Sequence, residues 1–182
     1  MKNISTGRFG YKNGKFLPEE QLTVHIYEEE FMFGSAVFEM FRTFKHKFFL
    51  FEEHIKRLFT SMKIYQIEID KTANEIYEIC HHLTELNADH FRNDEYRFMI
   101  NVSRGPLSIY KDVFALEENE EWGKPTWIIN AWPLSKTAKT MAHYYDTGAN
   151  AVIVPQRQIP AQFLDPKVKS RSRAHLMLAN LQ

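Results

Sequence analysis

The chain has 182 residues, of which 44% are hydrophobic and 25% charged, with fifteen Phe and eight Tyr, and this composition excludes a disordered chain. Its formal net charge is zero, so no overall field would attract nucleic acid or an anionic membrane surface. The single cysteine, Cys80, excludes an internal disulfide and a cysteine-rich metal centre, and the lack of a long apolar run argues against secretion or membrane insertion, so we expect a cytoplasmic protein.

The first expected element is a β-hairpin centred on Asn13-Gly14. Tyr11 and Phe16 flank this pair on either side. An Asn-Gly pair favours a type I′ turn, because both central residues of that turn need a positive φ. The chain therefore opens with two short strands.

A longer strand is expected from Ala36 to Phe44, because its residues alternate in character. One face would carry Phe38, Met40, Arg42 and Phe44, and the other Val37, Glu39, Phe41 and Thr43. A polar turn at residues 45–47 and a returning strand at 48–51 would complete a second hairpin.

Two amphipathic helices are predicted next by apolar residues at helical spacing. The first has an apolar stripe of Ile55, Leu58, Phe59 and Met62, with His54, Arg57 and Ser61 on the opposite side. The second runs from about residue 72 to 87 on Ile76, Ile79, Cys80, Leu83 and Leu86.

Strands return at residues 96–103 and 126–132, with a long surface loop at 105–125 between them. Strands and helices in this order predict an α+β fold for an N-terminal domain, residues 1–133.

Residues 134–145, which contain several lysines, are interpreted as an interdomain linker. A strand at 149–154, a proline-rich loop and a helix from Ser170 would begin a second domain over 146–182. These pieces cannot bury their own apolar faces, so we expect this second domain to be incomplete in the chain.

Lys169 is a candidate nucleophile within PKVKSRSRAHLML. Its cationic neighbours Lys167, Arg171 and Arg173 would disfavour the protonated amine and so favour a nucleophilic one. The alternative is a solvated basic patch. No glycine-rich phosphate loop, paired metal-ligand motif or GxSxG sequence offers a competing centre.

Two arginines are candidate ligand-binding residues. Arg57, on the polar side of its helix, could bind a phosphate through a bidentate fork, or it could simply be solvated. Arg42 falls on a strand face otherwise made of Phe38, Met40 and Phe44, where an unpaired charge is costly. It is either a carboxylate receptor in an apolar pocket or a strand-edge arginine that reaches solvent.

Three stretches resemble a known family in their order and spacing. They are FMFGSAVFEMFRTFKHKFFLFEEHIKRLFTSMKI at residues 31–64, the strand from Arg97 to Ser-Arg-Gly at 103–105, and PKVKSRSRAHLMLA at 166–179. Together they resemble the class IV aminotransferases, the fold type IV pyridoxal-phosphate group that includes branched-chain aminotransferase, D-amino-acid aminotransferase and aminodeoxychorismate lyase. The implied fold is the N-terminal α/β domain of the D-amino-acid aminotransferase-like fold, followed by the first strand and helix of an incomplete second domain.

The resemblance also implies a cofactor and its ligands. It places pyridoxal 5′-phosphate in a Schiff base with Lys169, with Lys167 as the second choice, and its phosphate on Arg57. The residues implied to line the substrate side of the site are Phe33, Phe38, Met40, Arg42 and Arg97.

The implied function is a transaminase that moves an amino group between an amino acid, branched-chain-like, and a 2-oxo acid, as a homodimer. A lyase related to the aminodeoxychorismate enzymes, or a truncated inactive form that serves as a dimerisation or binding domain, are the alternatives. Three departures leave the substrate open. Ala174 stands where the branched-chain enzymes have a tyrosine, and Met40 stands where glycine or threonine is usual. Ser-Arg-Gly at 103–105 leans toward the D-amino-acid and lyase branches.

Overall fold

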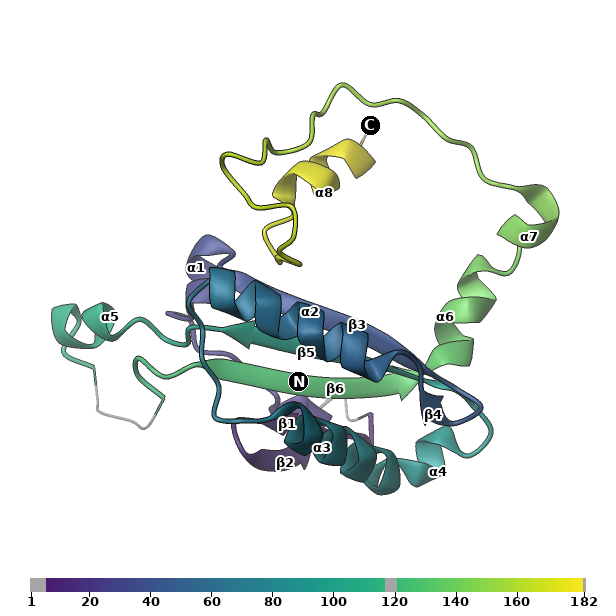
Figure 1. The fold of residues 1–182 in the computed structure, drawn as a ribbon, viewed down its shortest axis with the longest axis horizontal. Helices are drawn as coiled ribbons and strands as arrows, with labels where there is room; N and C mark the ends of the chain where they lie inside the picture. Colours follow the sequence, from purple (N-terminus) through teal and green to yellow (C-terminus); the bar gives the residue numbers. More distant parts are fainter. Residues whose placement is uncertain (1–5, 117–120, 182) are drawn as a thin grey trace, which may run out of the picture.

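The computed structural model describes residues 6–116 and 121–181. Its centre is a six-stranded antiparallel sheet in the order β2-β1-β6-β5-β3-β4 (Figure 1). The strands are β1 (Phe9–Lys12), β2 (Lys15–Pro18), β3 (Ala36–Phe44), β4 (Lys47–Phe48), β5 (Tyr96–Ser103) and β6 (Thr126–Pro133). The neighbouring strands β1 and β6 therefore come from distant parts of the chain.

Two fourteen-residue helices, α2 (Phe51–Ile64) and α3 (Ala73–Leu86), cover one face of the sheet (Figure 1). A capping box begins α3: the Thr72 hydroxyl accepts from the Glu75 N–H, and the Glu75 carboxylate accepts from the Thr72 N–H. The shorter helices are α1 (Glu29–Phe33), α4 (Ala88–Phe91), α5 (Ser108–Val113), α6 (Leu134–Met141), α7 (Tyr144–Thr147) and α8 (Ala174–Asn180), and η1 (Glu19–Gln21) is a 3-10 turn. No helix of the described residues is long and apolar enough to cross a membrane.

The core lies between the sheet and these two helices, as the predicted patterns require. Val37 and Phe41 of β3 point into it, and the predicted stripe of α2 meets them. Leu58, Ile100 and Ile129 are fully buried there. Each such side chain contributes roughly 1.5–3 kcal/mol relative to full exposure, so this layer supplies most of the stability. The other face of β3, with Phe38 and Met40, is left for other contacts.

Both predicted hairpins are present, although the second is shorter than expected. Asn13 and Gly14 have φ of 46° and 95°, as the Asn-Gly turn requires. In the second hairpin the returning strand ends at Phe48, and α2 begins at Phe51. The expected strand over 48–51 is wrong in its second half, because Phe51 packs from the helix onto Phe41, with 5.3 Å between ring centroids.

Two segments expected to lack regular structure contain helices. The loop at 105–125 carries α5, and the linker at 134–145 carries α6 and the start of α7. No glycine or proline interrupts residues 134–147, and Pro133 stands just before α6, where its fixed φ favours helix initiation. Leu134 is buried, and the Ser135 N–H donates to Asp94 Oδ1 at 3.0 Å, which fastens α6 to the sheet end.

The strand expected at 149–154 is absent from the described structure, and the last helix begins at Ala174 rather than Ser170. Val152 and Ile153 are 77% and 104% exposed, and in the described residues no strand pairs with them. A strand forms only where a neighbour can accept its hydrogen bonds. Residues 169–171 have such a neighbour: they pair with β3, which delays α8 and positions the candidate site.

Candidate functional site

Lys169 is fixed by a short extended strip that runs along the first residues of β3. Its carbonyl accepts from the Phe38 N–H at 3.0 Å, and the Arg171 N–H donates to the Ala36 carbonyl at 2.8 Å. Between them an isolated bridge pairs Val37 with Ser170. This pairing adds the strip to the sheet edge that β4 leaves uncovered.

The strip alternates like a strand, which decides where its side chains lie. Val168 is buried in the core, and the Ser170 hydroxyl lies 2.9 Å from that of Tyr65, so both face the helix layer. Lys169 and Arg171 lie over the Phe38 ring. The Lys169 N–H also donates to Ser61 Oγ of α2 at 3.1 Å. The lysine is thus attached to both the sheet and α2.

The amine of Lys169 is partly buried and surrounded by cations. Nζ lies 4.6 Å from the centroid of the Phe38 ring. Burial lowers the pKa of the Lys169 amine; Glu39 opposes this shift, and Arg57, Arg173 and Arg171 add to it. A larger neutral fraction makes the amine a better nucleophile. By contrast, Lys167 is exposed.

Arg57 is held in place by a buried carboxylate. Its Nε and Nη2 each donate to Glu39 at 2.7 Å, one to either oxygen, and the Glu39 side chain is fully buried. The His54 ring nitrogen Nδ1 lies 3.1 Å from the same carboxylate, and the Met40 N–H donates to it at 2.7 Å. Burial alone would raise the pKa of Glu39, but bonds from Arg57, the Met40 N–H and His54 keep that pKa below its usual value.

The bonds to Glu39 leave part of the Arg57 guanidinium accessible to a ligand. The Arg57 side chain is 49% exposed, and its bond to Glu39 raises its pKa, so the group is a fixed cation. Ser61, which binds the Lys169 N–H, follows Arg57 on α2 by four residues and so lies on the same helix side. Arg57 also lies close enough to the Lys169 amine to lower its pKa, so the two cationic groups converge on one region of the protein.

The structure separates the remaining predicted site residues into two places. Phe38 and Met40 lie on the face of β3 that carries Lys169, whereas Arg42 and Arg97 pair in register at its other end. Four residues of strand, or about 13 Å, separate Arg42 from Phe38. Arg42 is exposed, and its Nε donates to the Thr43 carbonyl at 2.9 Å, as a strand-edge arginine would.

Phe33 stands apart from the strand residues, at the end of α1, and is 62% exposed. Gly34 follows it in the left-handed region, with φ of 66°. A Cβ at Gly34 would lie 3.8 Å from Ser172, so the end of α1 approaches the strip that carries Lys169. Phe33 directly precedes Gly34 in the chain, so its backbone lies near this strip.

The sequence analysis considered Arg171 only as a charge near Lys169, but in the structure its side chain forms part of the candidate site. Its guanidinium carbon lies 4.0 Å from the Phe38 ring centroid, and its Nε donates to Asn101 Oδ1 of β5 at 2.8 Å. The signal available in the sequence was its spacing: in an extended segment, the residue two positions after Lys169 faces the same side.

A comparison with protein families shows to which family the chain belongs. The sequence profile of the family described as amino-transferase class IV matches residues 36–182, a span that includes β3, α2 and Lys169. The chain belongs to this family.

Relatives of this class IV aminotransferase chain carry three different names. It is 28% identical over 172 residues to a Methanocaldococcus jannaschii protein named "Putative branched-chain-amino-acid aminotransferase", which covers 94% of this chain and 54% of that protein. It is 33% identical over 95 residues to the aminodeoxychorismate lyase of Bacillus subtilis, and 29% identical over 105 residues to a D-alanine aminotransferase of Listeria monocytogenes. These matches cover 52% and 58% of this chain and 32% and 36% of those proteins.

Solved structures share the fold. A branched-chain amino acid aminotransferase complexed with N-(5′-phosphopyridoxyl)-L-glutamate, from the organism abbreviated T.th., superposes with a TM-score of 0.74 at 18% identity over 97% of this chain and 55% of that one. The enzyme of Thermoproteus uzoniensis with norvaline gives 0.74 at 18% identity, over 96% and 55%. The mixed α/β fold is therefore the expected one. This class IV chain spans about half the length of these proteins and of its Methanocaldococcus jannaschii relative.

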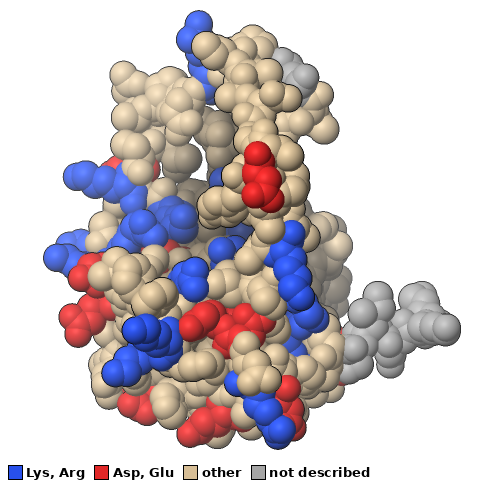
Figure 2. All heavy atoms as spheres, turned by 90° about the vertical axis from the view of Figure 1, so that its right-hand side faces the viewer, with Lys and Arg blue, Asp and Glu red and all other residues tan. Residues whose placement is uncertain are grey.

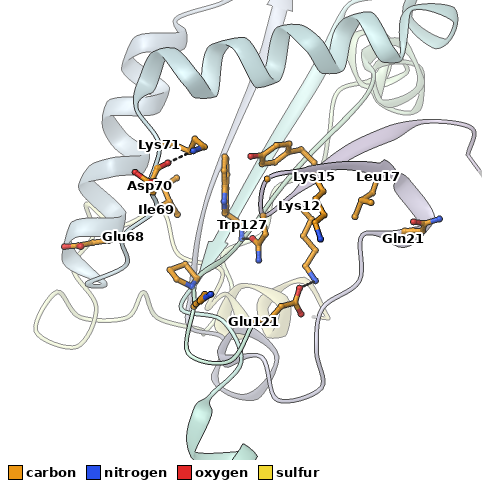
Figure 3. A pocket seen from close by; sticks show the side chains of 15 residues that line it. Lys12, Lys15, Leu17, Gln21, Glu68, Ile69, Asp70, Lys71, Glu121 and Trp127 are labelled. Carbon is orange, nitrogen blue, oxygen red and sulfur yellow. Dashed lines mark hydrogen bonds and ion pairs between the residues drawn. The ribbon is translucent and has the colours of Figure 1, made fainter. Parts of the chain in front are cut away.

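The charged groups and cavities on the rest of the surface say less about where this class IV chain binds its ligands. Figure 2 shows Lys and Arg atoms around a hollow between the body of the protein and the chain segment above it. A cavity of about 710 Å³ lies beside the first hairpin, where Lys12 pairs with Glu121 at 2.8 Å (Figure 3). It contains none of the predicted site residues. The described residues form no group of three or more potential metal ligands.

Proposed function

We propose that this chain provides the lysine and the substrate-side wall of a pyridoxal 5′-phosphate-dependent transaminase. The observation that carries the proposal is the convergence of Lys169 and Arg57, one through the strip on β3 and the other through α2. An amine with a lowered pKa, beside a fixed and half-exposed guanidinium, fits a cofactor that has an aldehyde and a phosphate. Membership of the class IV aminotransferases supports the same cofactor.

Each residue would have a defined role. Lys169 would hold the cofactor through its Nζ and would take up and return the proton that leaves the amino acid's Cα. Arg57, oriented by Glu39, would bind the phosphate. Phe38 would form an apolar wall under the amine, and Phe33, Met40, Arg42 and Arg97 would extend the substrate side. The cofactor itself supplies the electron sink that makes the Cα proton acidic.

We propose an amino acid, branched-chain-like, and a 2-oxo acid as the exchanged substrates, in a homodimeric cytoplasmic protein. The names of the Methanocaldococcus jannaschii relative and of the solved structures support the branched-chain reading. Residues 1–133 would be the N-terminal domain, 134–145 the connection, and 146–182 the beginning of the cofactor-binding domain. Exposed apolar side chains such as Ile153 and Phe163 fit a segment that other chain elements cover.

The test is reconstitution of the complete protein with pyridoxal 5′-phosphate. We expect a yellow protein, and we expect borohydride reduction followed by peptide mapping to place the label on Lys169. Lys167→Ala is the matched control, because it removes a nearby exposed amine and should leave the label in place. A colourless protein, or a label on Lys167 alone, contradicts the proposal.

A lyase is the second candidate, favoured by the likeness to the Bacillus subtilis aminodeoxychorismate lyase over 95 residues. Ser-Arg-Gly at 103–105 and Ala174 lean the same way. Amino-group transfer from a panel of amino acids to 2-oxoglutarate or pyruvate, measured beside pyruvate release from aminodeoxychorismate, separates the two activities. If the protein binds the cofactor and performs neither reaction, the inactive binding-domain alternative is favoured.

A further inference from the structure

Three residues spaced four apart, along α2 and at its end, connect this helix to the candidate site. The first is Arg57. Ser61 binds the strip at Lys169, and Tyr65, which directly follows α2, binds the strip at Ser170. Residues four apart lie on the same side of a helix, each about 6 Å further along its axis. The proposed phosphate ligand and both attachments of the strip therefore belong to one side of α2.

The hydroxyl of Ser61 binds the strip rather than its own helix. Ser61 is fully buried, and its Oγ accepts from the Lys169 N–H at 3.1 Å. A helical serine or threonine often donates to the carbonyl four residues earlier, as the adjacent Thr60 does to Lys56 at 2.9 Å. In the part of the chain that the structure describes, Ser61 makes no such bond. Since a buried hydroxyl without a partner is costly, the contact with Lys169 is what satisfies it.

Tyr65 forms the second attachment and is itself held from the sheet. Its hydroxyl lies 2.9 Å from that of Ser170, a buried residue whose Oγ also accepts from the Ser172 N–H at 3.0 Å. The carbonyl of Tyr65 accepts from the guanidinium of Arg104, the residue after β5, at 2.9 and 3.2 Å. Tyr65 therefore joins the strip, the end of α2 and the end of β5.

The pairing with β3 alone constrains the strip only at a few points. It consists of one isolated bridge and two N–H···O bonds, at Ala36 and Phe38 of the strand. Such a short pairing is marginal by itself, because few bonds offset the loss of backbone freedom. Ser61 and Tyr65 reach the strip from the helix layer instead, so that Lys169 is held from two directions.

We propose that Ser61 and Tyr65 are positioning residues that fix the distance between the Lys169 amine and the Arg57 guanidinium. The inference rests on the proposed transaminase function and concerns the same site. Neither hydroxyl would touch the cofactor or the substrate. Each would act through the backbone of the strip, so that the group that binds the aldehyde and the group that binds the phosphate act on one molecule at once.

Loss of a fixed spacing should weaken one kind of ligand selectively. Pyridoxal 5′-phosphate uses both groups, whereas pyridoxal has the aldehyde without the phosphate, and pyridoxamine 5′-phosphate has the phosphate without the aldehyde. A ligand that uses one group alone does not depend on the distance between the two. The ligand with both groups does depend on it, because its second contact is strengthened by the first only at the right separation.

The experiment measures the affinities of these three compounds for the complete protein by absorbance titration and calorimetry. For Ser61→Ala we expect the affinity for pyridoxal 5′-phosphate to fall by about 3- to 10-fold, the effect of one neutral hydrogen bond. The affinities for pyridoxal and pyridoxamine 5′-phosphate should stay within about twofold, because each uses one contact alone. Tyr65→Phe, which keeps the ring packing, should show the same selectivity, and it carries the test if Ser61→Ala does not fold.

Two matched variants remove similar hydroxyls that do not contact the strip. Thr60→Ala removes the neighbouring hydroxyl of α2. Tyr96→Phe removes a hydroxyl that lies 3.0 Å from His46 Nδ1, at the other end of β5 from Arg104. Both variants should leave all three affinities within about twofold of the wild-type values.

The spacing role is overturned if Ser61→Ala and Tyr65→Phe weaken the three compounds equally, which is the result of a purely structural role. It is also overturned if neither variant weakens pyridoxal 5′-phosphate binding, or if the two control variants show the same selectivity. A wild-type protein that takes up no pyridoxal 5′-phosphate refutes the proposed function and the spacing role together. Uptake by the wild-type protein with unchanged affinity in both variants refutes the spacing role alone.

Discussion

The sheet with its two covering helices differs from the C-terminal segment, residues 149–181, in how far its apolar side chains are buried. In the first region Leu58, Phe98 and Ile129 are fully buried. In the segment Ile153 and Phe163 are 104% and 82% exposed, and Val168 is its buried apolar side chain within the described residues. The first region therefore holds the fold. In the proposed site the segment would supply the reactive amine, and a few backbone bonds to β3 determine where that amine lies.

Removing the amine of Lys169 should have the largest effect. Lys169→Ala keeps the backbone bonds of the strip and removes the group that, in the proposed function, would hold the cofactor and move the proton. Transamination by the complete protein should fall by at least ~10³-fold, the upper part of the range for acid–base groups. Its thermal unfolding temperature should change little. Steady-state rates and a melting curve measure both, and a loss of folding equal to the loss of activity would contradict the separation of the two regions.

A core truncation should have the opposite pattern. Leu83 of α3 is fully buried, so Leu83→Ala should lower the free energy of unfolding by about 3 kcal/mol. Leu86→Ala on the same helix, where the side chain is 38% exposed, should cost less than about 1 kcal/mol. Urea titrations measure both costs. Borohydride labelling of folded Leu83→Ala should still occur at Lys169, and a lost label there would mean that the core and the site are coupled.

Glu39 connects the two regions, because it belongs to β3 and orients Arg57 beside the amine. Glu39→Gln keeps the shape of the side chain and removes the negative charge that holds Arg57, so the guanidinium should lose its fixed orientation. The affinity for pyridoxal 5′-phosphate should fall by roughly 10-fold, since one charge-assisted pair is lost.

The control for this variant is pyridoxal, which lacks the phosphate. Its affinity should change by less than about twofold, because it does not need Arg57. Absorbance titrations with the two aldehydes provide the comparison. Equal weakening of both would indicate that Glu39 supports the fold rather than the phosphate contact.

The local parts of this fold could be predicted from the sequence. The alternation of residues 36–44 and the apolar stripe of α2 were read correctly, because each depends on neighbours a few positions away. The strand expected at 149–154 was wrong for a physical reason: an apolar run becomes a strand only where it finds a partner. The helices in the expected linker were missed because lysines and threonines were taken as a sign of a loop, although nothing there interrupts a helix.

The site depended on contacts between distant residues. The bridge from Val37 to Ser170 and the bond from Lys169 to Ser61 join positions more than one hundred apart, and no local pattern contains them. Family resemblance could therefore suggest Lys169 and Arg57 as candidates, but the sequence could not place them together. One signal was overlooked: alternation puts Glu39 on the core side of β3, and a buried carboxylate requires a cationic partner. That partner is Arg57.

The smallest expected effect concerns Glu28, which fastens the chain before α1 to the sheet. Its side chain is 1% exposed and accepts bonds from the hydroxyls of Ser103 and Thr126, the second at 3.0 Å. Burial raises the pKa of Glu28 above its ordinary value of 4.5, and the two hydroxyls and Lys12 only partly oppose this. Because the folded pKa exceeds the unfolded one, the stabilisation is complete below pH 4.5 and is lost as the pH rises through the folded pKa.

Glu28→Gln cannot titrate, so its stability should depend less on pH than that of the wild-type protein. The difference in unfolding free energy between the two should shift by up to about 1 kcal/mol in favour of the variant between acidic and neutral pH. Urea titrations near both pH values measure this shift, with Glu68→Gln in an exposed loop as the control. Parallel stability curves for Glu28→Gln and the wild-type protein would mean that the carboxyl keeps its ordinary pKa. The chain before α1, which leads to Phe33 and the strip beside Gly34, would then be attached independently of pH.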